Sequence, residues 1–331
     1  MINMKKVAKK ANVSISTVSR VFSNKKYYIK ESTREKVLAA AKELGYFPNG
    51  FTAGIHGAAT HNIALFVPSI SNEMFPPIIK GAEDFLRKKG YNIILCIIND
   101  DLEIEKYYVN KLRNGIVDGF IICSMLSKSD SIRKLIKEEF PVVLVARYYN
   151  DNCNAVIIDN FQASYDAVNY LLRTGKKRIA VVLGPKELNV YGQRLEGYKE
   201  AIKNAGIEFD EKLIINETSG DNGLYQGITE LLKRDSQIDA IFATNDHKAI
   251  ITMKAIHDLG LKIPDDISVL GFDNIKVSTM LNPPLSTVSQ PFYEMGKLAA
   301  TKIYNIINGQ GPKEPVVDVL NTEIIIRKTT I

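Results

Sequence analysis

The stretch VAKKANVSISTVSRV, residues 7–21, decides the fold of the first part of this chain. Its small apolar residues recur at helical spacing in two segments, so that each segment can bury one face. These residues are Val7, Ala8 and Ala11 in the first segment and Val18 and Val21 in the second. The pattern predicts two short helices around a tight turn, and its basic residues suit a pair that places one helix in the major groove of DNA.

The residues at the turn agree with this prediction. Asn12 tolerates the left-handed backbone that such a turn uses, and Ser14 can cap the second helix. Burial of the apolar face leaves four residues facing outward: Ile15, Ser16, Ser19 and Arg20. An exposed Ile15 suits contact with a thymine methyl group. Arg20 could read guanine, which is worth about 1–3 kcal/mol of discrimination, or it could contact a phosphate or form a surface ion pair.

A third helix is predicted over residues 33–45, followed by a weaker one over residues 48–60. The third helix has an apolar stripe that includes Val37 and Leu44, and Gly45 is a good C-terminal stop. Pro48 can open the next helix, but three glycines weaken it. A segment that becomes ordered only on its target fits this composition.

The basic charge is concentrated in the same region. Residues 1–60 hold eleven Lys and Arg against three Glu, a net charge of +8, whereas the remainder holds 32 basic and 34 acidic residues, a net charge of −2. A solvated Lys-rich domain would also explain the charge alone. Together with the helix spacing, it favours a head that binds a polyanion, joined to a nearly neutral body.

From Asn62 onward the sequence alternates between strand-like and helix-like runs. Strands are predicted over residues 63–67, 92–98, 119–123, 142–146, 156–158, 178–183, 240–244 and 268–271. Helices are predicted over residues 73–89, 102–114, 162–173, 194–205, 222–234 and 246–259. This alternation favours parallel sheets covered on both faces, and the length suits two of them. Ligands of such folds bind at the C-terminal ends of the strands.

Several functional classes find no support in the sequence. No apolar run approaches the roughly 18 residues of a membrane helix. The three cysteines and four histidines form no metal-ligand spacing, and no phosphate-loop, dinucleotide, metalloprotease or serine-hydrolase motif occurs. We therefore expect no catalytic residue, metal or cofactor, and a cytoplasmic location.

Polar residues follow several of the predicted strands. They are Ser69, Ser71 and Asn72, Arg147, Asp159 and Asn160, Asn245 and Asp246, and Asp273 and Asn274. Each alone is explained by a helix cap or a loop. Because they recur at strand ends, together they indicate a polar ligand in a cleft between two lobes.

Over essentially its whole length the chain resembles the LacI/GalR family of bacterial transcription regulators. Residues 7–21 match its Val-Ala-x-x-Ala-Gly-Val-Ser-x-x-Thr-Val-Ser-Arg-Val motif, with Asn12 in place of the Gly. Residues 33–37 and 45–49 match its third helix and the start of its hinge. Its body signature is matched over residues 245–249, 260–274 and 284–288.

The resemblance implies an all-α helix-turn-helix head (residues 1–47), a hinge helix and linker (48–60), and a periplasmic-binding-protein-like α/β core of two parallel-sheet lobes (61–331). The N-lobe would comprise about 61–159 and 290–320, and the C-lobe about 160–289 and 321–331. It also implies a homodimer on a pseudo-palindromic operator in double-stranded DNA. Because residue 331 is not preceded by a heptad tail, we expect a dimer rather than a tetramer.

The resemblance also implies site residues. Those facing DNA are Ile15, Ser16, Thr17, Ser19, Arg20, Asn24, Thr33, Asn49 and Ile55, of which Ile55 takes the place of a hinge Leu that wedges into the minor groove. Those facing a sugar or sugar phosphate are Ser69, Ser71, Phe75, Arg147, Asp159, Arg194, Asn245 and Asp273. A surface ion pair is the plainer explanation for Arg194, and helix capping for Asp273.

Some positions depart from the family pattern. Thr52 and Ala53 replace the usual hinge Ala and Arg, and Ala146 stands where many sugar-binding relatives carry Asp. Leu188 and Val190 count against a purine effector.

Residues 270–289 also resemble the catabolite-control branch, which binds a phosphocarrier protein. A repressor controlled by a ligand is the main hypothesis; a sugar-metabolising enzyme, a solute-binding protein and a DNA-compacting protein are the alternatives.

Overall fold

The computed structural model describes residues 4–22, 27–44, 59–149, 152–217 and 220–330, and only the backbone of Lys42. The predictions for Asn24, Asn49 and Ile55, and nearly all of the hinge at 48–60, lie outside these residues. The described part of the head contains three helices: α1 (Met4–Ala11), α2 (Ile15–Val21) and α3 (Glu31–Leu44).

The core of the head consists of the residues predicted from their spacing. It is built from Val7, Ala8, Ala11, Val18, Val21, Val37, Ala40 and Ala41. Asn12 has a φ of 54°, as the turn requires. The Ser14 hydroxyl accepts a hydrogen bond from the Thr17 N–H at 3.0 Å, which caps α2. The predicted helix-turn-helix is therefore confirmed.

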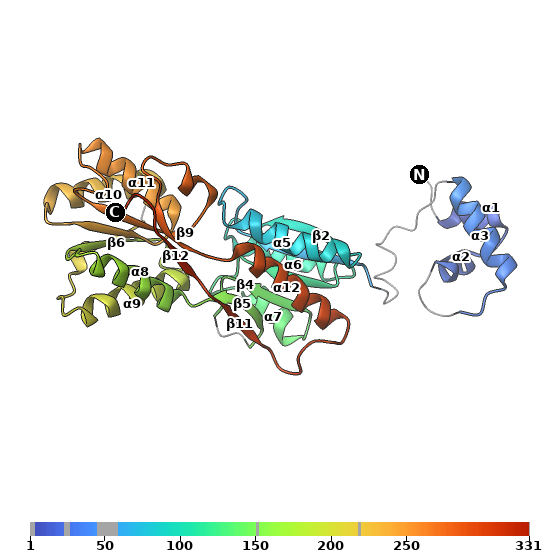
Figure 1. Ribbon diagram of the computed structural model, residues 1–331. Coiled ribbons are helices and arrows are strands. Elements are labelled where there is room, and N and C mark those ends of the chain that lie inside the picture. The colour runs from blue at the N-terminus through green and yellow to red at the C-terminus, as the bar shows by residue number, and fades with distance from the viewer. Residues whose placement is uncertain (1–3, 23–26, 45–58, 150–151, 218–219, 331) are drawn as a thin grey trace.

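The first lobe of the core is a parallel six-stranded sheet (Figure 1). Its strands, in the order β11-β5-β4-β3-β1-β2, are β1 (Asn62–Val67), β2 (Asn92–Ile97), β3 (Gly119–Ile122), β4 (Val142–Val145), β5 (Asn154–Ile158) and β11 (Val317–Leu320). Alternate strand residues pack on opposite faces: Leu65 lies in one core cluster with α5 (Phe75–Lys88) and α12 (Phe292–Ile307), whereas Phe66 lies in another with α6 (Leu102–Leu112) and α7 (Asp130–Lys137).

The second lobe repeats this plan. Its strands, in the order β12-β10-β9-β8-β6-β7, are β6 (Ile179–Leu183), β7 (Ile214–Asn216), β8 (Ala240–Ala243), β9 (Ser268–Asp273), β10 (Ser286–Ser289) and β12 (Glu323–Ile325). Only β12 pairs antiparallel, with β10. Two helices, α8 (Asn160–Arg173) and α9 (Asn189–Asn204), cover one face, and α10 (Gly220–Arg234) and α11 (Asp246–Asp258) cover the other (Figure 1). Two short 3-10 helices, η1 (Glu211–Leu213) and η2 (Lys276–Thr279), complete the lobe.

Two helix pairs approach so closely that only Gly fits at the contact. A Cβ atom on Gly296 of α12 would lie 1.9 Å from the Ile78 carbonyl oxygen of α5, and one on Gly81 would lie 2.0 Å from that of Tyr293. In the second lobe, a Cβ on Gly197 of α9 would lie 2.3 Å from the Phe161 carbonyl oxygen of α8. Close-packed helices of this kind hold the loops at the sheet edges in place.

The architecture confirms the predicted fold class, an α-helical head with a two-lobed α/β core. The chain passes from the first sheet to the second after β5, returns after β10 through α12, and crosses again between β11 and β12. Among the helices of the described residues, none is long and apolar enough to cross a membrane.

Candidate functional site

A polar cavity lies between the two lobes, at the C-terminal ends of their strands. The first lobe contributes Asn72, Met74, Phe75, Cys123, Ala146, Arg147 and Ile158, and the second contributes Asn160, Leu188, Val190, Tyr191, Arg194, Asn245 and Asp273, with Gln290 on the crossing segment. Five of the eight predicted effector residues are therefore brought together: Phe75, Arg147, Arg194, Asn245 and Asp273.

Arg194 is built into the wall of this cavity. Its side chain is buried, with Nε donating to Asn160 Oδ1 at 2.9 Å and Nη1 donating to the Thr244 carbonyl at 2.5 Å. Its guanidinium lies 3.7 Å from the centre of the Phe272 ring. Burial lowers the pKa of Arg194, and the charge of Asp273 opposes that effect. Arg194 is thus no surface ion pair, and its remaining N–H groups are oriented donors for a ligand.

Asp273 ends β9 and supplies the carboxylate of the cavity. Its Oδ1 accepts a hydrogen bond from Gln290 Nε2 at 2.6 Å, and it caps no helix. Its φ of 121° is unusual for a residue with a Cβ, and such backbone strain concentrates at functional sites. Burial raises the pKa of Asp273 to about 6, although Arg194 acts to lower it.

Asn245 both begins α11 and faces the cavity. Its Oδ1 accepts from the Lys248 N–H at 2.8 Å, and its Nδ2 donates to the Tyr191 hydroxyl at 3.3 Å. Beside it, Asp246 is fully buried and accepts hydrogen bonds from the Thr287 hydroxyl at 2.5 Å and the Ile275 N–H at 2.9 Å. Burial, and then the like charge of Asp273, raise the pKa of Asp246 to about 7.

In the first lobe, Arg147 and Phe75 face the cavity. Arg147 is nearly buried and forms a two-pronged ion pair with Asp100, with Nη1 to Oδ1 at 2.5 Å and Nη2 to Oδ2 at 3.1 Å. Phe75 begins α5, is buried, and lines the cavity together with Met74 and Asn72. Asp100 itself does not line the cavity, and it was not among the predicted site residues.

Three predicted effector residues do not line this cavity. The Ser69 hydroxyl accepts from the Ser71 N–H at 3.0 Å, which uses it to fold the loop after β1, and Ser71 is exposed. Asp159 is exposed and accepts from the Gln162 N–H at 2.9 Å as the N-cap of α8. Its neighbour Asn160 takes the position in the cavity instead. Ser69 and Asp159 thus have turn and capping contacts in this structure, and the effector role of all three residues stays a prediction.

The lobes are closed on the cavity. Its volume is about 60 Å³, below the roughly 300–1,000 Å³ of ordinary ligand pockets. An outer recess of about 410 Å³ shares Ala146, Asn160 and Val190 with it. Two hydrogen bonds join the lobes beside this recess, from Asn189 Nδ2 to the Tyr148 carbonyl at 2.6 Å and from the Tyr149 hydroxyl to the Glu187 carbonyl at 3.4 Å. Entry of a ligand therefore requires the lobes to separate.

Five of the predicted DNA-binding residues, Ile15, Ser16, Thr17, Ser19 and Arg20, lie on α2, and Thr33 lies near the start of α3. Ile15 is 49% exposed, Ser16 and Arg20 are exposed, and Thr17, Ser19 and Thr33 are half-buried. The Arg20 guanidinium lies 5.5 Å from the centre of the Tyr27 ring, and Tyr28 is 97% exposed. These two tyrosines were not among the predicted DNA-binding residues, because two aromatic residues next to lysines are only a weak sequence pattern.

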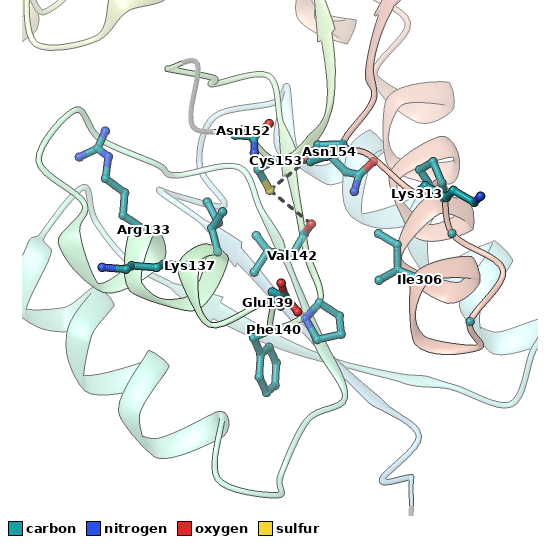
Figure 2. Close-up of a pocket in the computed structure, with 16 residues that line it drawn as sticks. Arg133, Lys137, Glu139, Phe140, Val142, Asn152, Cys153, Asn154, Ile306 and Lys313 are labelled. Atoms are coloured by element: carbon teal, nitrogen blue, oxygen red, sulfur yellow. Dashed lines mark hydrogen bonds between the residues drawn. The ribbon is translucent and has the colours of Figure 1, made fainter.

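A larger cavity, of about 820 Å³, lies at the start of β4 and β5 in the first lobe (Figure 2). Its labelled cations Arg133 and Lys137 extend away from Asn154 and Ile306, so they do not converge on a common point.

The described residues contain no cluster of three His, Cys, Asp or Glu that could hold a metal ion. The three thiols are buried, and burial raises the pKa of Cys96 to about 11 and of Cys123 to about 12.

Comparison with known proteins agrees with this arrangement. Residues 3–49 match the family model of bacterial regulatory proteins of the lacI family, and residues 60–323 match that of periplasmic binding proteins and the sugar binding domain of the LacI family. The chain is 37% identical to the HTH-type transcriptional regulator RegA of Clostridium saccharobutylicum, over 99% of both chains. It is 34% identical to catabolite control protein A of Priestia megaterium, over 98% of both.

Among solved structures, the lac repressor dimer bound to operator and the anti-inducer ONPF superposes with a TM-score of 0.82, at 26% identity over 100% of this chain and 99% of that one. A helix-turn-helix head joined to a two-lobed core with a polar cavity defines a DNA-binding transcriptional regulator rather than an enzyme. The chain belongs to the LacI family of bacterial regulatory proteins.

Proposed function

We propose that this protein is a repressor of genes of carbohydrate metabolism. It binds a pseudo-palindromic operator as a homodimer, and a small sugar or sugar phosphate in the interlobe cavity changes its affinity for DNA. The observation that carries the proposal is the composition of that cavity, whose wall is divided between the lobes. A ligand that contacts both lobes stabilises one angle between them. The free energy by which it shifts this equilibrium equals the difference between its binding free energies for the two states, typically about 1–3 kcal/mol.

The chemistry of the wall suits a sugar. Arg194 and Arg147 offer N–H donors, Asp273 offers an acceptor, and the amides of Asn160 and Asn245 offer both. Phe75, Met74, Ile158 and Tyr191 provide the apolar and aromatic surface on which a sugar ring can lie. Ser69, Ser71 and Asp159, which do not line the closed cavity, are not included in this proposal.

In the head, we assign base recognition to Ile15, Ser16 and Arg20, with Thr17, Ser19 and Thr33 as supporting contacts to DNA. Their exposure on α2 and at the start of α3 supports this assignment. Asn24, Asn49 and Ile55 complete the proposed contacts. The proposed domains are the head at 1–47, the hinge at 48–60 and the two-lobed core at 61–331.

The proposed dimer uses exposed apolar residues of the core. Leu95 and Ile97 on the edge strand β2 are 42% and 37% exposed, Ile70 is 52% exposed and Met280 is 66% exposed. Exposed apolar edge strands are uncommon unless a partner covers them. The lac repressor structure, whose fold this chain shares, is named as a dimer on its operator. A cytoplasmic location follows from the proposed access to chromosomal DNA.

A second candidate is a catabolite-control regulator whose corepressor is a phosphocarrier protein. The identity of 34% to catabolite control protein A supports it. The two candidates differ in what must be added to operator DNA: a sugar alone suffices for the first, whereas the second needs the phosphocarrier protein. Titration of the operator complex with each partner separately distinguishes them.

The test of the main proposal is the variant Arg194→Gln, with Arg173→Gln as its control. Arg173 carries the same charge but is exposed at the end of α8. We expect Arg194→Gln to bind operator normally and to lose its response to sugar, while Arg173→Gln retains both. Fluorescence anisotropy of labelled operator measures both properties. An Arg194→Gln variant that keeps its circular dichroism spectrum but still responds to sugar contradicts the proposal.

A further inference from the structure

The interlobe cavity contains an ion pair that no property of a sugar ring explains. Arg147 lines the cavity, and its partner Asp100 lies behind it in the loop between β2 and α6. The side chain of Arg147 is 11% exposed and that of Asp100 is 36% exposed, so the arginine is the buried member. Two parallel N–H to carboxylate contacts fix the plane of the guanidinium as well as its position.

The backbone beside Arg147 is also strained. Arg147 N donates to the Val145 carbonyl at 2.8 Å, which makes a three-residue turn centred on Ala146 with a φ of 65°. Turns of this hand are rare and strained. In the partner loop, Asn99 and Asp100 have φ values of 56° and 53°, a left-handed conformation that both residue types adopt readily. The strained turn beside Arg147 indicates that the contact with Asp100 is maintained by the fold.

The basic side chains at and behind the cavity wall lie close to carboxylates. Arg147 is paired with Asp100, and Arg194 interacts with Asp273. Behind Tyr191, Lys248 Nζ lies 2.7 Å from Glu217 Oε2 and 5.3 Å from the tyrosine ring centre. Arg147 and Lys248 therefore each have a carboxylate partner, and the charge of Asp273 acts on Arg194. A phosphate ester, which carries about −1.5 to −2 charge at pH 7, meets no uncompensated cation here.

We infer that Asp100 is a positioning residue that sets the specificity of the cavity: by neutralising Arg147 it selects an uncharged sugar over a phosphorylated or acidic one. The inference rests on the proposed function and names the ligand class of the same site. With Asp100 bound to Nη1 and Nη2, and the Ser124 carbonyl 3.4 Å from Nη1, Arg147 retains Nε–H and one Nη2–H as donors to hydroxyl oxygens. Arg147 thus acts as an oriented, charge-neutral donor.

The test compares wild type with Asp100→Asn. Calorimetric titration uses pentoses, hexoses and disaccharides, each beside its phosphate ester. We expect wild type to bind at least one neutral sugar and to bind the matched ester at least about tenfold more weakly. In Asp100→Asn the ratio of these two affinities should shift toward the ester by about tenfold, which corresponds to about 1.4 kcal/mol. Asp100→Glu should restore the wild-type ratio. If Asp100 only maintained the structure, its replacement would weaken the binding of the sugar and of the ester to the same extent.

The matched control is Asp101→Asn. Asp101 is the neighbouring carboxylate and caps α6 through the Glu103 and Ile104 N–H groups, a role that Asn fills as well. The variant Asp101→Asn should leave the ratio of the affinities for the neutral sugar and its phosphate ester unchanged. A second measurement needs no sugar: inorganic phosphate at constant ionic strength should raise the melting temperature of Asp100→Asn by more than it raises that of wild type.

The outcomes separate the two proposals. If no sugar or ester binds, the proposed function fails, and the phosphate measurement still decides the role of Asp100. If wild type prefers an ester, or if Asp100→Asn changes neither the ratio nor the response to phosphate, the inference is overturned while the proposed function stands.

Discussion

The buried carboxyl of Asp246 makes a quantitative prediction about stability. Its pKa rises from 3.8 to about 7 because of burial and the nearby Asp273. Since each pKa unit corresponds to about 1.4 kcal/mol, ionising this group costs the folded protein about 4 kcal/mol. A carboxyl whose pKa is raised on folding keeps the folded state most stable below pH 4, and that stability is lost as the pH rises to about 7. About 2–3 kcal/mol of the loss falls between pH 5 and pH 8.

The variant Asp246→Asn removes the charge while keeping the shape. Its amide oxygen can accept from the Ile275 N–H, and its amide nitrogen can donate to the Thr287 hydroxyl, so both present contacts keep a partner. We therefore expect the free energy of unfolding of the variant to exceed that of wild type by about 2–3 kcal/mol more at pH 8 than at pH 5.

Urea unfolding of the full-length protein, followed by circular dichroism at pH 5, 6, 7 and 8, measures this difference. The control is Asp265→Asn, because Asp265 is exposed and the same change of charge there should alter stability by less than about 0.5 kcal/mol at every pH. If the difference in the free energy of unfolding between Asp246→Asn and wild type stays constant with pH, or narrows as the pH rises, the raised pKa of Asp246 is contradicted.

Two further predictions concern the ligand and the dimer. Because the pKa of Asp273 is about 6, lowering the pH from 7.5 to 5 should protonate it and weaken sugar binding by about tenfold, and calorimetry on Asp273→Asn should give weak binding that varies little with pH. A wild-type affinity that is independent of pH would show that Asp273 is not a ligand-binding acceptor. The double variant Leu95→Glu, Ile97→Glu should be a monomer by light scattering and should lose operator affinity, whereas Val319→Glu, on the opposite edge strand β11, should remain a dimer. A dimeric double variant would place the interface elsewhere.

Much of the fold was predictable because its signals are local. Val7 and Ala11 in the first helix, and Val18 and Val21 in the second, repeat at helical spacing, and the buried strands of the core are continuous apolar runs, so both patterns follow from the sequence. The strand predictions omitted β7, β10, β11 and β12. These are short, and β10 (Ser286–Ser289) carries three hydroxyl residues, so its pairing with β9 depends on contacts that a local pattern does not contain.

The site was predictable to a smaller extent. Arg194 and Asp273 lie within recognisable motifs, and the structure places both in the cavity. Asp159 and Asn160 are adjacent, and the sequence analysis chose the one that caps α8, because capping and ligand binding use the same residue types. Asp100 was missed because it approaches Arg147 across 47 positions of sequence, and only the folded loop after β2 brings the two together.

We propose that α2 reads a specific operator and that a sugar in the interlobe cavity controls how fully the operator is occupied. The most direct test of this proposal is selection of bound sequences from a random DNA pool at near-physiological salt, with and without a panel of neutral sugars. We predict enrichment of one pseudo-palindrome whose recovery changes with a particular sugar, and loss of that enrichment when Ile15, Ser16 and Arg20 are all replaced by Ala. Recovery of no preferred sequence, or equal recovery from wild type and the triple variant, would contradict the account.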